Sequence, residues 1–313
     1  VHAREAPPGY RLKGVSTLLD SAGAVVQTWV KTAKEPDPAQ ATLQAFRQAM
    51  ELEPLPRAAP VAGPGEDTTR HDRLTVYPLG DPHFGMLSWP EETGEDFNLQ
   101  IARANLMEAT GRLVSMAPPT TEALIVNLGD FLHADNYESR TARSGNALDV
   151  DSRWSKVLRV SVWTLIEMVR QALTKHSRVK VIHAKGNHDD TSAYMLAVCM
   201  AAHFMDEPRV EIEESPGAFH YHEFGSTLIG VTHGHTVKAA QLPLLMAADK
   251  PEAWGRTRFR YWLTGHVHHE SVKEHAGATV ETFNTLAAKD AWHHGQGYRA
   301  RRSMKCDVYD HRG

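Results

Sequence analysis

Five histidines lie in two short runs of the sequence, THGHT at 232–236 and LTGHVHHE at 263–270. Each run follows an apolar segment and contains a glycine. Side chains two residues apart on a strand point to one face, and a glycine at the end of the strand lets the backbone turn. Two imidazoles can then be offered to one place, which indicates a metal site, and the 19 histidines of the 313-residue chain strengthen that expectation.

Acidic and amide side chains, the oxygen ligands that such a site needs, follow three apolar segments earlier in the chain. RLTVYPLGD, EALIVNLGD and RVKVIHAKGNHDD begin at residues 73, 122 and 178, and each predicts a strand that ends beside a glycine. In α/β sheets the carboxyl ends of the strands are where sites are built. The polar groups at all of these strand ends are Asp81, His83, Asp130, Asn187, His188, His233, His266 and His268.

The chemistry of this set is consistent. Carboxylate, amide oxygen and imidazole make a mixed oxygen and nitrogen shell, which suits manganese, iron or zinc better than calcium or copper(I). Eight groups are too many for one ion and about right for two. One carboxylate can bridge two ions about 3.5–4 Å apart, and such a pair can hold both oxygens of an in-line displacement at phosphorus.

The segments between these groups predict a layered α/β fold. After residue 72, strands alternate with helices, which we expect at 97–117, 151–176 and 191–206. The second half is rich in short strands, with one helix near 238–249. This pattern favours two sheets with outer helices. The helix at 151–176 carries an apolar stripe that we expect in the core: Trp154, Leu158, Val162, Leu165 and Val169.

The front of the chain differs from this main domain. Residues 10–31 predict a β-hairpin with a turn at DSAG, and residues 38–52 predict a short helix. Pro, Gly and small residues then predict a linker at 53–70. We therefore expect an appendage at 1–52 and a catalytic domain at 71–313. The appendage and the absent initiator Met favour a piece of a longer protein, encoded by a phage or mobile element.

Composition sets outer limits on function. A net charge of −4 does not indicate a nucleic-acid binder by total charge, although local patches matter more than totals. The two cysteines, Cys199 and Cys306, form no C-x-x-C pair, so a disulfide framework and a thiolate zinc site are not expected. No apolar run approaches the roughly 20 residues of a membrane helix. We expect a cytoplasmic protein with no membrane partner.

The ordered motifs D-x-H, G-D, G-N-H-D, H and G-H-x-H, across residues 81–268, resemble the calcineurin-like metallophosphoesterase family. The resemblance implies a four-layer sandwich of two mixed β-sheets flanked by helices. It also implies two divalent metal ions, with Mn²⁺ expected and Fe or Zn as alternatives. Asp81, His83, Asp130 and His268 would hold one ion. Asp130, Asn187, His233 and His266 would hold the other, with Asp130 as the bridge.

The resemblance also implies the reaction. A water shared by the ions would lose a proton and attack the phosphorus of a phosphate ester. His188 would not be a ligand, but would bond the phosphate or protonate the leaving oxygen. Within THGHT we expect His233, directly after the strand, to bind metal in preference to His235.

One position separates branches of this family. Many members carry an acid three residues after the G-D aspartate, whereas this chain has His133 there. In that respect it resembles the exonuclease subunit of double-strand-break repair complexes. We therefore expect His133, like His188, to be a catalytic residue that is not a metal ligand, and we expect a phosphodiester substrate, DNA or RNA. The alternatives are a phosphatase, a small-nucleotide phosphodiesterase such as one for cyclic nucleotides, or a non-catalytic module that binds nucleic acid or a protein partner.

Further residues are open to two interpretations. Arg140, Arg143 and Arg153 lie in a loop that could contact phosphates or simply be solvated. The stretch with Trp254, Arg256, Arg258 and Arg260 could stack bases or lie on an ordinary surface. The histidines expected to be ordinary surface or core residues are His183, His220, His222, His269, His293 and His294.

Overall fold

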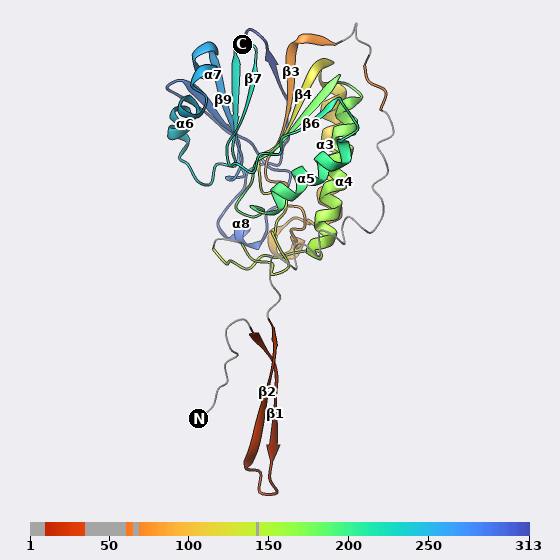
Figure 1. Ribbon diagram of the computed structural model, residues 1–313, viewed down its shortest axis with the longest axis vertical. Coiled ribbons are helices and arrows are strands. Elements are labelled where there is room, and N and C mark those ends of the chain that lie inside the picture. The colour runs from red at the N-terminus through yellow and green to blue at the C-terminus, as the bar shows by residue number, and fades with distance from the viewer. Residues whose placement is uncertain (1–9, 35–60, 65–68, 142–143) are drawn as a thin grey trace. The chain divides into compact units, whose positions relative to one another are not determined.

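The structure is a computed structural model, and it describes residues 10–34, 61–64, 69–141 and 144–313 (Figure 1). The chain divides into two compact units, Val1–Glu51 and Leu52–Gly313. The helix predicted at 38–52 and most of the predicted linker at 53–70 lie outside the described residues.

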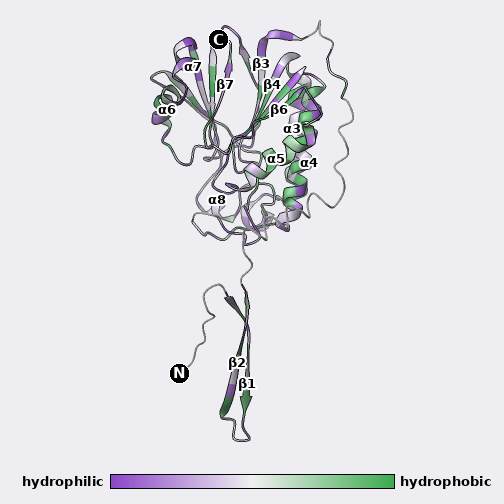
Figure 2. Cartoon of the chain, in the orientation of Figure 1, coloured by the Kyte–Doolittle hydropathy of each residue, from purple (hydrophilic) through white to green (hydrophobic). Residues whose placement is uncertain are grey.

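The first unit contains the predicted hairpin, which is confirmed. Strands β1 (Tyr10–Leu19) and β2 (Val25–Lys34) pair antiparallel. The turn between them is closed by Asp20, whose carboxylate accepts the backbone N–H groups of Ala22 and Ala24 at 2.9 and 2.8 Å. Parts of both strands are hydrophobic (Figure 2), and hydrophobic side chains on both are exposed, since Val25 retains 62 % of its surface.

The second unit contains two sheets, and the first is a five-stranded mixed sheet in the order β12-β3-β4-β5-β6. Four of its strands are parallel, and β12 pairs antiparallel with β3 at one edge. The strands are β3 (Arg70–Leu79), β4 (Thr120–Asn127), β5 (Arg178–His183), β6 (Val210–Ile212) and β12 (Asp307–Asp310).

A second five-stranded mixed sheet has the order β10-β11-β9-β8-β7. Strands β8, β9 and β11 are parallel, and β7 and β10 are antiparallel to their neighbours. The strands are β7 (His220–Phe224), β8 (Thr227–Val231), β9 (Phe259–Thr264), β10 (Ser271–His275) and β11 (Ala278–Thr282).

Helices cover the outer face of each sheet (Figure 1). On the first sheet lie α3 (Leu99–Met116), α4 (Trp154–Leu173) and α5 (Ser192–Phe204). On the second lie α6 (Leu242–Asp249), which follows the 3₁₀ turn η2 (Ala239–Gln241), and α7 (Pro251–Arg256). The predicted four-layer sandwich of two mixed sheets flanked by helices is confirmed. Three short helices, α2 (Pro90–Thr93), α7 and α8 (Ala291–Gly295), were not predicted from the sequence, because none is long enough to show a period.

The core between the two sheets is built from the inward faces of their central strands. Val76 and Val126 of the first sheet meet Ile229 and Leu263 of the second in one fully buried cluster. The apolar stripe predicted on 151–176 is buried as expected, since Trp154, Leu158, Val162, Leu165 and Val169 each expose 6 % or less of their surface. Such close packing fixes where each strand ends, and so fixes the residues that follow.

Two further sequence expectations can be compared with the structure. Both cysteines are free thiols. Among the helices of the described residues, none has the length and apolar character that crossing a bilayer requires.

Candidate metal centre

The predicted site residues meet at the joined carboxyl ends of both sheets. Asp81 and His83 follow β3, Asp130 follows β4, and Asn187 and His188 follow β5. From the second sheet, His233 follows β8, and His266 and His268 follow β9. Strands β3, β4 and β5 run parallel to one another in the first sheet, and β8 and β9 do so in the second, so within each sheet these ends lie on one edge.

The backbone at these residues is strained. Six described residues other than glycine have a positive φ, and five of them are predicted ligands: Asp81, His83, Asp130, His266 and His268. A left-handed backbone costs a residue with a Cβ about 1–2 kcal/mol. Such strain persists only where the surrounding structure imposes it, and it gathers at functional sites. This clustering is independent of the side-chain geometry.

One group of ligand atoms comes from Asp81, His83 and His268, whose candidate ligand atoms lie within 4.8 Å of one another. The Nε2 atoms of the two imidazoles are 3.0 Å apart. The Asp81 Oδ1 atom is 3.4 Å from His268 Nε2. Both oxygens of Asp81 also accept the backbone N–H of His266 at 2.9 Å, so the carboxylate is held in place by the second sheet.

A second group comes from Asp130, His233 and His266, also within 4.8 Å. His233 Nε2 lies 3.1 Å from Asp130 Oδ2 and 3.1 Å from Asn187 Oδ1. The other ring nitrogen, Nδ1, donates to the Leu128 carbonyl at 2.8 Å, which leaves Nε2 as the lone-pair nitrogen of neutral His233. His235, the alternative within THGHT, belongs to neither group. The distances place Asp130 in this second group, and its bridging role stays a prediction.

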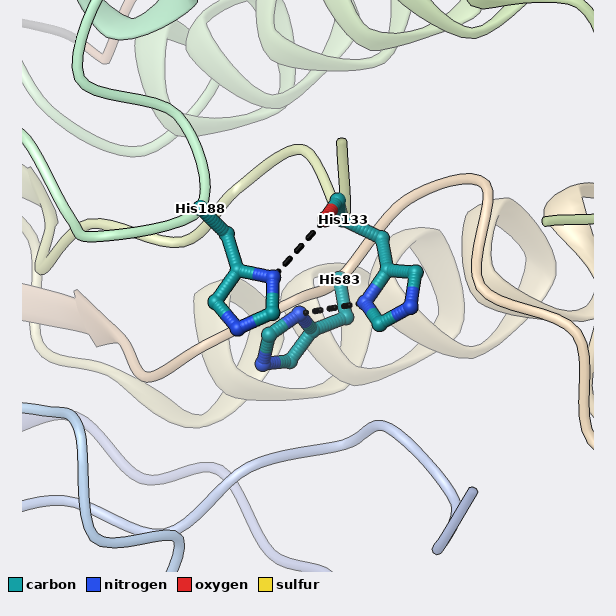
Figure 3. Close-up of side chains that lie close together, drawn as sticks. All are labelled: His83, His133 and His188. Atoms are coloured by element: carbon teal, nitrogen blue, oxygen red, sulfur yellow. Dashed lines mark hydrogen bonds between the residues drawn. The ribbon is translucent and has the colours of Figure 1, made fainter. Parts of the chain in front are cut away.

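A third group, His83, His133 and His188, lies against the first (Figure 3). His188 Nδ1 donates to the His133 carbonyl at 2.8 Å. His133 Nδ1 lies 3.1 Å from His83 Nδ1. The imidazoles of His133 and His188 stack with their centroids 5.2 Å apart. The structure therefore brings His133 and His188 together, and their catalytic roles stay predictions.

These contacts restrict the tautomers. The His83 Nε2 atom faces His268, so a ligand lone pair on Nε2 requires the proton to sit on Nδ1. That proton points at His133 Nδ1, which must then accept. Metal-binding histidines commonly donate their other N–H in this way, which fixes the ring. His133 is therefore placed to orient His83, and its own Nε2 is buried without a hydrogen-bond partner.

Sequence reasoning gave no role to Asp189, which organises the loops beneath the ligands. This buried carboxylate accepts the backbone N–H groups of Asp130, Phe131 and Gly186 at 3.0, 2.7 and 2.9 Å. Asp130 Oδ1 in turn accepts the backbone N–H of His188 at 2.8 Å. The G-D and G-N-H-D loops are thus tied together through two carboxylates.

Glycines let these loops come close. A Cβ on Gly186 would lie 1.9 Å from Asp130 Oδ1, and one on Gly265 would lie 2.5 Å from Asp81 Oδ2. Both distances are far below van der Waals contact. The glycines before Asn187 and His266 are therefore required by the close approach of their backbone to a carboxylate of another motif.

Burial and neighbouring charges set the pKa values. Burial lowers the pKa of His133 to about 3, and His188 acts in the same direction. Burial also works to lower the pKa of His233, but the Asp130 carboxylate outweighs it and raises that pKa to about 10. For Asp130 burial works upward, and the His233 imidazole outweighs it, so the pKa is held well below its usual range. Asp130 and His233 thus form a buried pair of carboxylate and protonated imidazole, and a cation bound at His233 Nε2 would take the place of that proton.

The residues fit a pair of divalent cations. Two basic imidazole nitrogens face each other at 3.0 Å in the first group, and a carboxylate and an amide oxygen approach His233 Nε2 in the second. Lone pairs that converge in this way repel one another unless protons or cations lie between them. The mixed oxygen and nitrogen donors suit manganese, iron or zinc.

A cavity of about 510 Å³ opens beside the ligands. Its walls include Asp130, Asn187, His188, His266 and His268. This volume is typical of small-molecule and cofactor sites. The lining also includes Thr141 and residues from 144–149, part of the loop that the sequence suggested could contact phosphates, and residues around α8, which the sequence had not connected with the site.

His293, expected to be an ordinary histidine, lies at this site. Its imidazole stacks on His268 with the centroids 4.6 Å apart and an interplanar angle of 17°. Asp290 accepts from His293 Nδ1 at 2.7 Å and also caps the start of α8 through the His293 backbone N–H at 2.8 Å. His293 therefore packs against a predicted ligand and is itself fixed by a carboxylate. The D-x-x-H spacing was the only sequence signal for this pair.

The basic and aromatic residues considered for nucleic-acid contact have other partners. The Arg260 guanidinium lies 4.0 Å from the centroid of Trp254 and donates to the Trp254 carbonyl at 2.6 Å. Arg256 pairs with Glu223 at 2.7 Å. Arg140 donates to the Gly145 carbonyl at 2.8 Å. A base-stacking role at Trp254 is not favoured, because Arg260 already covers a face of its ring. Arg143 lies outside the described residues.

Comparisons with known proteins do not add to what the site itself shows. No protein-family model matches the chain, and no curated protein matches it. Among solved structures, a conserved uncharacterized protein from Streptococcus pneumoniae, described as a predicted phosphoesterase, is 13 % identical, with 77 % of this chain and 86 % of that chain covered and a TM-score of 0.35. Vps29 from Entamoeba histolytica, complexed with Zn²⁺, is 13 % identical, with 76 % and 99 % covered and a TM-score of 0.33. These values are too low to transfer a function.

Proposed function

We propose that this protein is a metal-dependent phosphoesterase with two divalent cations. The observation that carries the proposal is the convergence of two groups of ligand atoms, one from Asp81, His83 and His268 and one from Asp130, His233 and His266. Both groups lie at the carboxyl edge of the two sheets, on backbone held in a left-handed conformation at five positions. Strained acids and imidazoles at one edge are expected of a catalytic metal centre rather than of ordinary turns.

Different residues of the site would have different roles. The two groups would hold the cations, with Asn187 beside His233, and His133 would orient His83. Bound divalent cations supply Lewis acidity toward a phosphate oxygen and activate water at near-neutral pH. The protein contributes the fixed geometry, the buried carboxylates that balance the cationic charge, and the neighbouring cavity for the ester.

His188 is the group that can act on the substrate. Its Nδ1 is committed as a donor to the His133 carbonyl, so neutral His188 has its lone pair on Nε2 and protonated His188 has an N–H there. His188 also lines the cavity. It is therefore placed to donate to a phosphate oxygen or to return a proton to the leaving oxygen.

The substrate that we favour is a phosphodiester of DNA or RNA. The support is the position of His133, which contacts both His83 and His188 where many family members resembled by the sequence carry an acid. A second candidate is a small-nucleotide phosphodiesterase. It is favoured by the cavity lining, which holds Asp130, Asp149 and Asp290 but, among its described residues, no Lys or Arg for additional phosphates.

The test uses the full chain reconstituted with Mn²⁺ and a diester with two aryl groups, bis(4-nitrophenyl) phosphate. We expect metal-dependent turnover that is lost with a chelator and restored by metal. His188→Ala should lower kcat by about 10²–10⁴-fold while the bound metal content is retained, as expected for loss of a general acid. Turnover without metal would contradict the metal dependence, and metal bound with no hydrolysis of any ester would favour the non-catalytic alternative.

A matched control keeps the test specific. His269 lies one residue beyond the last motif, is exposed, and bonds only its own loop through the Val267 carbonyl at 2.9 Å. His269→Ala should therefore retain wild-type turnover and metal content. DNA, RNA and cyclic nucleotides offered to the same preparations then decide between the two substrate classes.

A further inference from the structure

Three aromatic residues line the cavity together with the predicted ligands, and one of them stacks on His268. Trp292, His293 and Tyr298, here called the aromatic wall, come from α8 and the turn after it. The Trp292 and Tyr298 ring centroids are 5.9 Å apart, and those of His293 and Tyr298 are 5.1 Å apart. The wall is therefore a contiguous aromatic surface rather than separate side chains.

The aromatic wall is held by contacts at His293, next to the metal centre, and is exposed to solvent at Trp292. His293 is fixed by its bond to Asp290 and by stacking on His268. Trp292 stands at the other end and exposes 59 % of its surface. A large aromatic ring left open beside a polar cavity marks a place where a flat apolar group can bind.

The charge of the cavity restricts what that group can be. The described lining residues include three carboxylates, from Asp130, Asp149 and Asp290, and no Lys or Arg. The cations would neutralise the scissile phosphate, but a second phosphate in the cavity would meet no Lys or Arg side chain among the described lining residues. The rest of the substrate must therefore be held by stacking and by neutral polar groups. Ser144 and Asn146 lie in the same lining and offer such groups.

A nucleobase has the required properties, because it is flat, uncharged and has polar edges. Bases stack on exposed tryptophan in proteins that bind single-stranded nucleic acid, and every base has a face for this contact. Double-stranded DNA would not present a base to the wall without unstacking it. The geometry thus favours an unpaired nucleotide at the metal centre.

We propose that Trp292 is a specificity-determining residue that stacks on the nucleobase adjoining the scissile phosphodiester. This inference rests on the proposed phosphodiesterase function and names the recognised part of its substrate. Both a dinucleotide and the end of a single strand present an unpaired base next to a phosphodiester. Tyr298 and His293 support the indole, and the carboxylate-lined cavity excludes further phosphates.

The test compares two diesters that differ only in the base. A dinucleoside monophosphate and its analogue with an abasic sugar at the position beside the cavity are hydrolysed by the Mn²⁺-reconstituted chain. Wild type should prefer the base-bearing diester in kcat/KM by a factor on the order of 5–150, the range expected for stacking of one base. Trp292→Ala should bring this ratio close to one, and Trp292→Phe should retain most of it.

Tyr194→Ala serves as the control, because Tyr194 is 45 % exposed on α5 and lines a different cavity. It should keep the wild-type ratio. An equal ratio in wild type and Trp292→Ala would overturn the proposal. A single-stranded oligonucleotide hydrolysed faster than the dinucleotide would assign the natural substrate to nucleic acid, whereas the reverse would assign it to small nucleotides. In both cases the base-dependent ratio decides the role of Trp292.

Failure of this inference is separable from failure of the proposed function. If no diester is hydrolysed, calorimetry with thymidine 5′-monophosphate and deoxyribose 5-phosphate in the presence of Mn²⁺ still tests stacking. Tighter binding of the nucleotide by wild type, lost in Trp292→Ala, supports the role of Trp292 without any catalysis. Equal affinities for both ligands would overturn it.

Discussion

Replacing Gly186 by alanine tests whether the loops are packed around a fixed Asp130 carboxylate. The added Cβ would lie 1.9 Å from Asp130 Oδ1 and 2.4 Å from Asp130 N. Ordinary contact needs about 3.5 Å, so the carboxylate or the loop must move by roughly 1.5 Å. Neither is free to move, because Asp189 accepts the backbone N–H groups of both Gly186 and Asp130.

Two consequences of Gly186→Ala can be measured separately. Overpacking of this kind costs about 1–3 kcal/mol, so the metal-free variant should unfold at a lower urea concentration with an unchanged m-value. Displacement of a ligand carboxylate should also weaken Mn²⁺ binding by about 10–100-fold, comparable to the loss of groups that orient metal ligands. Urea unfolding followed by circular dichroism gives the first quantity, and isothermal titration calorimetry gives the second.

The matched control is Gly111→Ala in the interior of α3. There the new Cβ would find its nearest neighbour, Gln171 Oε1, at 3.8 Å, which is ordinary contact. Alanine should stabilise this helix by about 0.5–1 kcal/mol and leave metal binding unchanged. The reasoning is refuted if Gly186→Ala binds Mn²⁺ and unfolds like wild type.

Three further predictions concern residues around the site and in the core. His133→Ala should weaken Mn²⁺ binding by about 10–100-fold. His133→Asn, whose amide oxygen can accept from His83, should recover much of the lost affinity. If His133→Ala binds Mn²⁺ as tightly as wild type, the orienting role of His133 is refuted. Asp189→Asn should lower the free energy of unfolding, measured in urea, by about 2–4 kcal/mol, because the new amide N–H groups would face backbone N–H groups. A decrease below about 1 kcal/mol would contradict this. Burial lowers the pKa of His176 from 6.5 to about 4, so the folded state stays neutral while the unfolded state takes up a proton. Stability should therefore fall by about 3 kcal/mol as pH drops from 6.5 to 4, and His176→Gln should lose that part of the pH dependence; an unchanged slope in the variant would show that His176 does not contribute.

The strand-end motifs could be predicted from sequence for a definite physical reason. An apolar run followed by glycine and an acid marks a buried strand and the turn after it, and parallel strands end on one edge. The sequence therefore places Asp81, Asp130 and His266 near one another before any coordinates are known. The structure adds the left-handed backbone at these residues, which no residue type other than glycine signals reliably.

Other parts of the site could not be predicted, because their contacts depend on packing between distant segments. Asp189 bonds to Asp130 and Phe131 across 59 and 58 residues, and nothing local separates it from a turn aspartate. Trp292 lies on a helix of five residues, too short for periodicity to show. Trp254 had the stronger sequence signal for base stacking, since basic residues surround it, but that same proximity lets Arg260 cover its ring.

Counting and locating the bound cations tests the central claim most directly. The chain, stripped with a chelator and reconstituted with excess Mn²⁺, should retain two ions per molecule by elemental analysis after gel filtration. Anomalous scattering from crystals of that material should place one ion beside Asp81, His83 and His268 and the other beside Asp130, His233 and His266. No retained ions, or ions located away from these groups, would contradict the account.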